Sequence, residues 1–96
     1  MGELLNSKGL FPFQYRGRVT DANLFMEDGW GISSDDSLNI PQEAYKYGAI
    51  IHFGGNKQYA NMFQLYVPNN NSGLWFRGGY KSESDSVFEK TWQKIG

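Results

Sequence analysis

The chain has 96 residues, 17% of them aromatic, and its nine basic residues nearly balance its ten acidic ones. This length predicts one domain with a single core, and the balanced charge argues against a protein that binds nucleic acid or docks on an anionic membrane. The absence of cysteine excludes disulfides and thiolate chemistry, and one histidine is a poor basis for a zinc site, so we expect no cofactor and no metal.

The first 22 residues contain two short clusters, Leu10–Phe13 and Arg16–Arg18. We interpret residues 1–22 as a lead-in from an upstream stalk or linker, and residues 23–96 as the folded domain. Residues 23–32 predict one interrupted strand or a tight hairpin. The longest apolar run of the chain, Ala49–Ile51, is far too short for membrane insertion.

Helix signals are weak, because 12 glycines and a composition rich in strand-forming residues disfavour long helices. The best candidate is one short turn over Pro41–Tyr45. Proline suits a first helical position, and Asn39 would cap the turn.

Strand signals are stronger in the second half of the chain. The segments predicted as strands are Tyr47–Phe53, Ala60–Val67, Leu74–Gly78 and Val87–Ile95. The alternation in the second of them places Phe63, Leu65 and Val67 on one face and Met62, Gln64 and Tyr66 on the other. Turn residues separate the strands, among them the run Pro68–Gly73. We therefore predict an all-β domain, an antiparallel meander of about four to six strands with at most one short helical turn.

Catalytic signals are few. His52 lies between two apolar residues of a predicted strand, and we interpret it as a sheet histidine bonded to a neighbour. Ser33 and Ser34 lack an evident base, as a nucleophile would require. The carboxylates that a hydrolase acting on cell-wall polysaccharide would need all fall in predicted loops: Asp35, Asp36, Glu83 and Asp85. We rank this enzyme reading third, because adjacent loop acids are usually solvated.

Arg77 stands on a strand of large apolar residues, so its charge must be paired or must reach water. Aromatic rings stack on sugars, and amides bond their hydroxyls. We therefore take one hairpin as the candidate glycan-binding site: Trp75, Arg77, Tyr80, Asn69, Asn70 and Asn71. The alternative is structural, because a small β domain needs most of its aromatics for packing.

From about Asn23 to Ile95 the chain resembles the knob domain of pyocin and phage tail fibres. The motifs that carry the resemblance are Gly29–Ile32, Asn39–Pro41, Tyr47–Ile51, Phe63–Tyr66, Trp75–Arg77 and Trp92–Ile95. The chain departs from the family at the first tryptophan of its closing pair, where Val87, Phe88 and Glu89 stand instead.

This resemblance implies a non-catalytic domain of a tail fibre or baseplate, located in a virion or an extracellular tail-like particle. It implies recognition of a host cell-surface glycan or cell-wall polymer, contacts with other fibre or baseplate chains, and a possible homotrimer. The alternative function that we keep open is a structural spacer or trimerisation module without a ligand.

Overall fold

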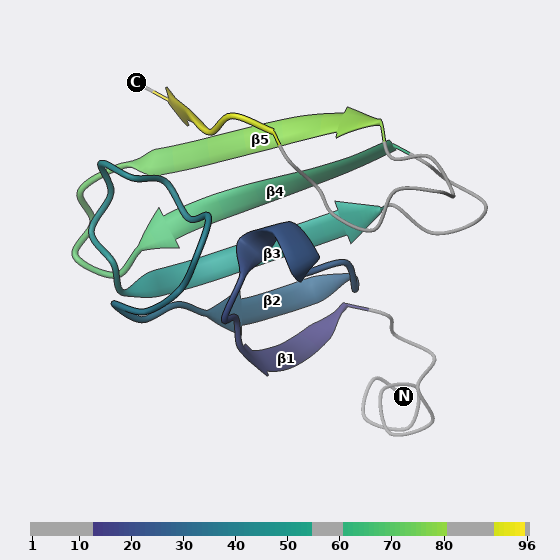
Figure 1. The fold of residues 1–96 in the computed structure, drawn as a ribbon, viewed down its shortest axis with the longest axis horizontal. Coiled ribbons are helices and arrows are strands. Elements are labelled where there is room, and N and C mark those ends of the chain that lie inside the picture. The colour runs from purple at the N-terminus through teal and green to yellow at the C-terminus, as the bar shows by residue number, and fades with distance from the viewer. Residues whose placement is uncertain (1–12, 55–60, 81–89, 96) are drawn as a thin grey trace.

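The protein folds around one six-stranded sheet, which a computed structural model describes for residues 13–54, 61–80 and 90–95 (Figure 1). The strands lie in the sheet in their order along the chain. They are β1 (Gln14–Arg18), β2 (Gly29–Ile32), β3 (Gly48–Gly54), β4 (Asn61–Pro68), β5 (Leu74–Tyr80) and β6 (Gln93–Ile95). The predicted all-β fold is confirmed.

Strands β2 to β6 form the predicted antiparallel meander. The first strand, β1, pairs with β2 in parallel, which no sequence signal predicted. It belongs to the segment interpreted as a lead-in, so the sheet begins before residue 23. Parallel neighbours need a crossover connection, and here residues 19–28 make it across one face of the sheet (Figure 1).

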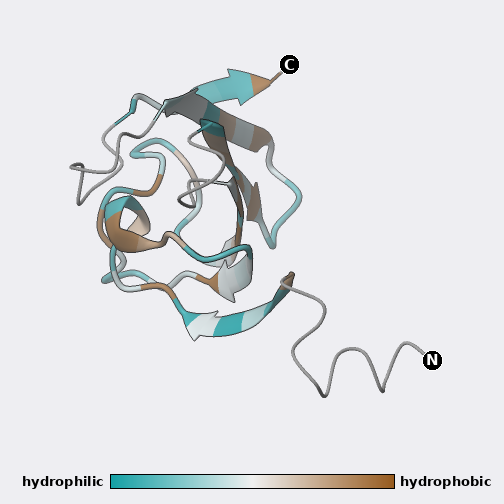
Figure 2. Cartoon of the chain, turned by 90° about the vertical axis from the view of Figure 1, so that its right-hand side faces the viewer, coloured by the Kyte–Doolittle hydropathy of each residue, from teal (hydrophilic) through white to brown (hydrophobic). Residues whose placement is uncertain are grey.

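This crossover contains the helical segment of the described chain, the 3-10 helix η1 (Ala22–Leu24). Asp21 caps it, because its carboxylate accepts a hydrogen bond from the Asn23 backbone N–H at 2.9 Å. Ala22 is fully buried against the sheet. In Figure 2, η1 and the long connection from β2 to β3 lie on the same side of the sheet. The core is therefore enclosed between the sheet and its loops.

The core members come from both layers: Val19, Ala22, Phe25, Ile40, Ala44, Ile50, Tyr66 and Trp75. Tyr66 is fully buried, and its ring meets Trp75 and Trp92 edge-on at centroid distances of 6.4 Å and 6.3 Å. Edge-to-face contacts of this kind add to area burial. Three aromatic residues, Phe25, Tyr66 and Trp75, thus belong to the core, and Trp92 packs against it.

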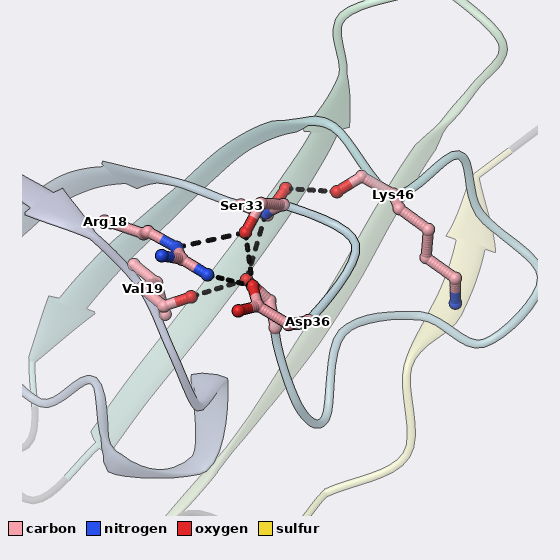
Figure 3. Close-up of polar contacts among 7 residues, drawn as sticks. Arg18, Val19, Ser33, Asp36 and Lys46 are labelled. Atoms are coloured by element: carbon pink, nitrogen blue, oxygen red, sulfur yellow. Dashed lines mark hydrogen bonds and ion pairs between the residues drawn. The ribbon is translucent and has the colours of Figure 1, made fainter.

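Serine hydroxyls tie the connection between β2 and β3 to the rest of the fold (Figure 3). Ser33 Oγ donates to the Lys46 carbonyl oxygen at 2.9 Å, and Ser37 Oγ donates to the Val19 carbonyl oxygen at 2.6 Å. At the surface, Asp36 pairs with Arg18. These bonds hold a long irregular segment in one position over the sheet.

Three local predictions are wrong. Residues 23–32 form neither an interrupted strand nor a hairpin, because η1 ends at Leu24 and only Gly29–Ile32 are strand. Pro41–Tyr45 makes a turn, with the Ala44 N–H bonded to the Pro41 carbonyl at 3.1 Å, but no helix. Asn39 has a φ of 61°, which is far from the extended backbone of a helix cap. The last strand is also shorter than predicted, because Lys90–Trp92 are not strand and β6 begins at Gln93. Val87–Glu89 lie outside the described residues.

Candidate functional site

A row of polar side chains crosses the covered face of the sheet. His52 on β3 pairs with Gln64 on β4, and Gln64 pairs with Arg77 on β5. All three are buried, with exposures of 0%, 0% and 2%. Directly opposed residues on neighbouring strands share a face, so the register of the meander places the three side chains in contact.

Gln64 is the centre of this row. Its Nε2 contacts the carbonyl oxygens of Ala22 and Phe25 at 3.0 Å and 3.1 Å, and His52 Nδ1 at 3.1 Å. Its Oε1 accepts a hydrogen bond from Arg77 Nε at 2.8 Å. One amide thereby joins three strands to the crossover that covers them.

His52 acts as a neutral member of the row. Its Nδ1 faces the Gln64 amide donor, so Nε2 carries the proton and donates to the Gly54 carbonyl at 3.0 Å. Burial lowers the pKa of His52 below its ordinary value, although the Gly54 carbonyl and the Asp28 charge oppose this shift. The predicted role, a sheet histidine bonded to neighbours, is confirmed.

Arg77 is bonded on several sides, as a buried guanidinium requires. Its Nη1 donates to Asn23 Oδ1 at 2.8 Å and to the Lys90 carbonyl at 3.1 Å. Its charged carbon lies 4.5 Å from the centre of the Trp92 ring. Burial lowers the pKa of Arg77 to about 10, with the Asp21 charge acting against the shift, so the side chain stays charged at neutral pH.

Arg77 and Trp92 both line an open groove of about 700 Å³. It is bounded by β5, by the C-terminal segment and by residues 39–43 of the connection between β2 and β3. The residues that line it are Asn23, Asn39, Ile40, Pro41, Gln42, Glu43, Trp75, Arg77, Lys90, Thr91, Trp92 and Lys94. This volume is within the range of small-molecule sites.

The groove combines a buried floor with an exposed polar rim. Ile40, Pro41 and Trp75 are buried, and Lys94 Nζ lies 5.3 Å from the Trp75 ring centre. The polar side chains exposed on the rim are Asn39, Gln42, Glu43, Lys90, Thr91 and Lys94.

Trp92 lies at the boundary between floor and rim. It is half-buried, and its indole Nε1 donates to the Asn39 carbonyl at 2.8 Å. That bond fixes the plane of the ring, so the groove presents a partly exposed indole in a set orientation.

The structure divides the predicted hairpin site among three places. Trp75 and Arg77 belong to the groove, with exposures of 7% and 2%. Tyr80 alternates to the opposite face of the sheet and is 65% exposed. Asn69–Asn71 form the exposed turn between β4 and β5, where Asn71 has a φ of 61°. None of the residues in this last group lines the groove.

None of the polar groups exposed on the rim of the groove was predicted as a site residue. The closing Trp92-x-Lys94 pattern was a usable signal, because side chains two residues apart in an extended segment point to the same side. Residues 39–43 carried no such signal, because they are far from β5 in the sequence and come close to it only in the folded chain.

The carboxylates considered for hydrolysis are not gathered at this groove. Asp36 accepts hydrogen bonds from Arg18 and Ser34, which lower the pKa of its carboxyl to about 2. Asp35 and Asp36 are exposed, and neither lines the groove, where Glu43 is the carboxylate among the lining residues. Glu83 and Asp85 lie outside the described residues.

Two searches of the described part of the chain gave negative results. No group of three or more metal-ligating side chains was found in residues 13–54, 61–80 and 90–95. In the same ranges no helix has the length and apolar character needed to cross a membrane.

Comparisons with family models, with curated proteins and with solved structures found no match to this chain. The resemblance to the knob domain of pyocin and phage tail fibres therefore stays a prediction from the sequence motifs.

Proposed function

We propose that this chain is a non-catalytic host-surface recognition domain of a phage tail fibre or baseplate, and that the groove beside Trp92 holds a glycan. The observation that carries the proposal is the groove itself: a fixed, partly exposed indole surrounded by exposed amide, hydroxyl, ammonium and carboxylate groups. Rings of this kind stack on the apolar faces of sugars, and the polar rim bonds their hydroxyls.

The charges around the groove favour an acidic glycan. Among the described residues that line it, Arg77, Lys90 and Lys94 stand against one carboxylate, that of Glu43, although the whole chain has a net charge of −1. An excess of positive charge at a concave site attracts anionic ligands. The preferred ligand would therefore carry carboxylate or phosphate groups, and its affinity would fall as salt is added.

The motif resemblance gives this site its context. A domain at the tip or side of a tail fibre meets the glycans and cell-wall polymers of a host, and its other partners are the neighbouring fibre or baseplate chains. In this proposal the protein is located in the virion or in an extracellular tail-like particle.

A glycan array with neutral, uronic-acid and phosphorylated oligosaccharides tests the proposal, followed by titration of the best ligand against variants. We expect Trp92→Ala and Lys94→Ala to weaken binding by about tenfold or more, which corresponds to ~1.4 kcal/mol. Circular dichroism and thermal unfolding verify that each variant is folded.

Asn70→Ala and Tyr80→Ala are the matched controls, because both residues belong to the hairpin but not to the groove. If these two variants lose binding while Trp92→Ala and Lys94→Ala retain it, the ligand site is the turn and the face around Tyr80. If no member of the array binds, glycan recognition is contradicted.

The second candidate function is a spacer or trimerisation module of a fibre without a ligand. A specific observation favours it, namely that the face of the sheet opposite the groove exposes large apolar side chains. An oligomer that binds no glycan on the array would support this candidate over the first.

A further inference from the structure

The face of the sheet that the loops leave open is almost wholly apolar. Alternation along each strand and the register between strands place one set of side chains there. The exposed large apolar members are Phe13, Tyr15, Trp30, Ile32, Phe63, Val67, Phe76, Tyr80 and Ile95. We call this surface the open face.

Aromatic contacts form two groups of packed rings on the open face, and the strand register places both groups on the same side of the sheet. Phe53 stacks between Phe13 and Phe63, with ring centroids 4.9 Å and 4.8 Å away. Tyr15 packs on Trp30 across the β1–β2 pair, at 4.6 Å. The rings therefore form a preorganised surface and not scattered exposed residues.

The open face is larger than isolated domains usually expose. From their exposed fractions, these large apolar residues present on the order of 900 Å² together. The largest apolar patch on a typical monomer is roughly 300–600 Å². Each partner of a stable protein interface contributes about 800 Å².

Charge is absent from the middle of this surface. On the outward side of β2 to β5, no residue within the described parts of these strands is charged. The ion pair of Arg18 with Asp36 involves the edge strand β1 and not the middle of the sheet. An identical face would likewise bring no charge, so two such faces can meet without burying an unpaired ion.

We propose that the open face is covered by an identical copy of this chain, sheet against sheet. Two sheets packed in this way lie about 10 Å apart, with their inner side chains interdigitated. The groove lies on the other side of each sheet, so association leaves the grooves facing outward. The inference stands on the open face alone and does not require that the groove binds a glycan.

The mass of the full 96-residue chain in solution tests this proposal, measured by sedimentation equilibrium from about 1 to 500 μM, a range around the affinities of specific interfaces. We expect twice the chain mass at the upper concentrations, because one copy covers the open face of the other, and a threefold mass would contradict this face-to-face packing. Phe63→Glu and Phe76→Glu place a charge at the centre of the open face. Both side chains are exposed, so each variant should remain folded and become monomeric.

Leu38→Glu is the matched control, since Leu38 is also exposed, at 61%, but lies on the bridge to Asp21 in the loop layer. It should leave the oligomer unchanged. A wild-type chain that is monomeric over the whole range overturns the proposal, whatever else covers the face. So does an oligomer that persists in both folded glutamate variants.

Discussion

At the scale of single residues, the stability of the domain depends on a polar row in its interior. Gln64, His52 and Arg77 are buried together, and each is bonded to another member of the row or to a backbone carbonyl. A buried polar group that loses its partner costs far more than a bond contributes on average. The row therefore fixes the crossover to the sheet and penalises any other register.

Gln64→Leu should be among the most destabilising single changes in the chain. It removes the acceptor of Arg77 Nε and the donor that faces His52 Nδ1 and two backbone carbonyls. We expect a loss of about 3 kcal/mol or more in the free energy of unfolding, measured by urea denaturation. Gln42→Leu makes the same substitution at an exposed side chain, and it should alter the free energy of unfolding by less than about 0.5 kcal/mol. Equal effects of the two variants would contradict this role.

His52 should make the domain less stable in weak acid. Its folded pKa is lowered by burial, so below the unfolded value of about 6.5 the unfolded chain binds more protons than the folded one. The contribution of the neutral His52 to the free energy of unfolding is fully present above that pH. As pH falls from about 6.5 towards 5, the free energy of unfolding should decrease, by at most about 1.4 kcal/mol per pH unit from this residue.

Urea denaturation between pH 5 and pH 8 measures this slope. In a His52→Gln variant the slope between pH 6.5 and pH 5 should shrink, even if the variant is less stable at every pH. If the free energy of unfolding of His52→Gln falls with pH as steeply as that of the wild type, the loss of stability in weak acid comes from other groups and not from His52. Asp36 does not interfere in this window, because its pKa of about 2 and its ordinary value both lie below it.

At the scale of elements, close contact between strands requires small residues at certain positions. Gly48 opens β3 opposite Pro68, where an added Cβ would lie 2.4 Å from the Val67 carbonyl oxygen and 2.8 Å from the Pro68 Cα. Both neighbours are backbone atoms and cannot rotate away. On β5, a Cβ on Gly78 would meet its nearest atoms at 3.5 Å, an ordinary contact distance.

This pair of glycines gives a matched test of strand packing. Gly48→Ala should lower the free energy of unfolding by on the order of 2 kcal/mol, because the two strands must separate locally. Gly78→Ala should change it by no more than about 0.5 kcal/mol. Thermal unfolding of both variants measures the difference, and equal melting temperatures would show that the strands do not pack this closely.

The sequence predicts β4 and β5 well because both carry strict alternation. Alternation defines two faces but does not say which one is covered. On β4 the face with Met62, Gln64 and Tyr66 is buried, while the more apolar face with Phe63 and Val67 is exposed. A covered face that contains glutamine is unexpected from hydropathy alone, since its burial depends on partners from distant segments.

The parallel strand β1 and the helix η1 show a second limit of sequence reasoning. The two strands of a hairpin are joined by a short turn with characteristic residues, but two parallel strands are joined by a longer connection that has no such sequence signal. Asp21 before Ala22 was a valid capping signal for η1, although a three-residue helix is too short for a periodic pattern. The groove was not predicted because it too lacks a local sequence signal: residues 39–43 and the C-terminal segment are far apart in the sequence and come together only in the folded chain.

At the scale of the whole molecule, the sheet separates two surfaces of different character. One side carries the loops, the polar row and the groove, and the other is the open face. If identical copies cover the open face, grooves displayed on one assembly would bind a polymeric glycan with avidity greater than that of a single groove.

The most direct test of the central claim, glycan recognition in the groove, uses the three tryptophans of the chain. Trp75 and Trp92 line the groove, whereas Trp30 lies on the open face. The indole N–H signals of ¹⁵N-labelled protein should be followed by NMR during titration with the best acidic oligosaccharide from the array. The account predicts progressive shifts for Trp92, and smaller ones for Trp75, while Trp30 stays in place. A shift of Trp30 without Trp92, or no shift at all, would contradict it.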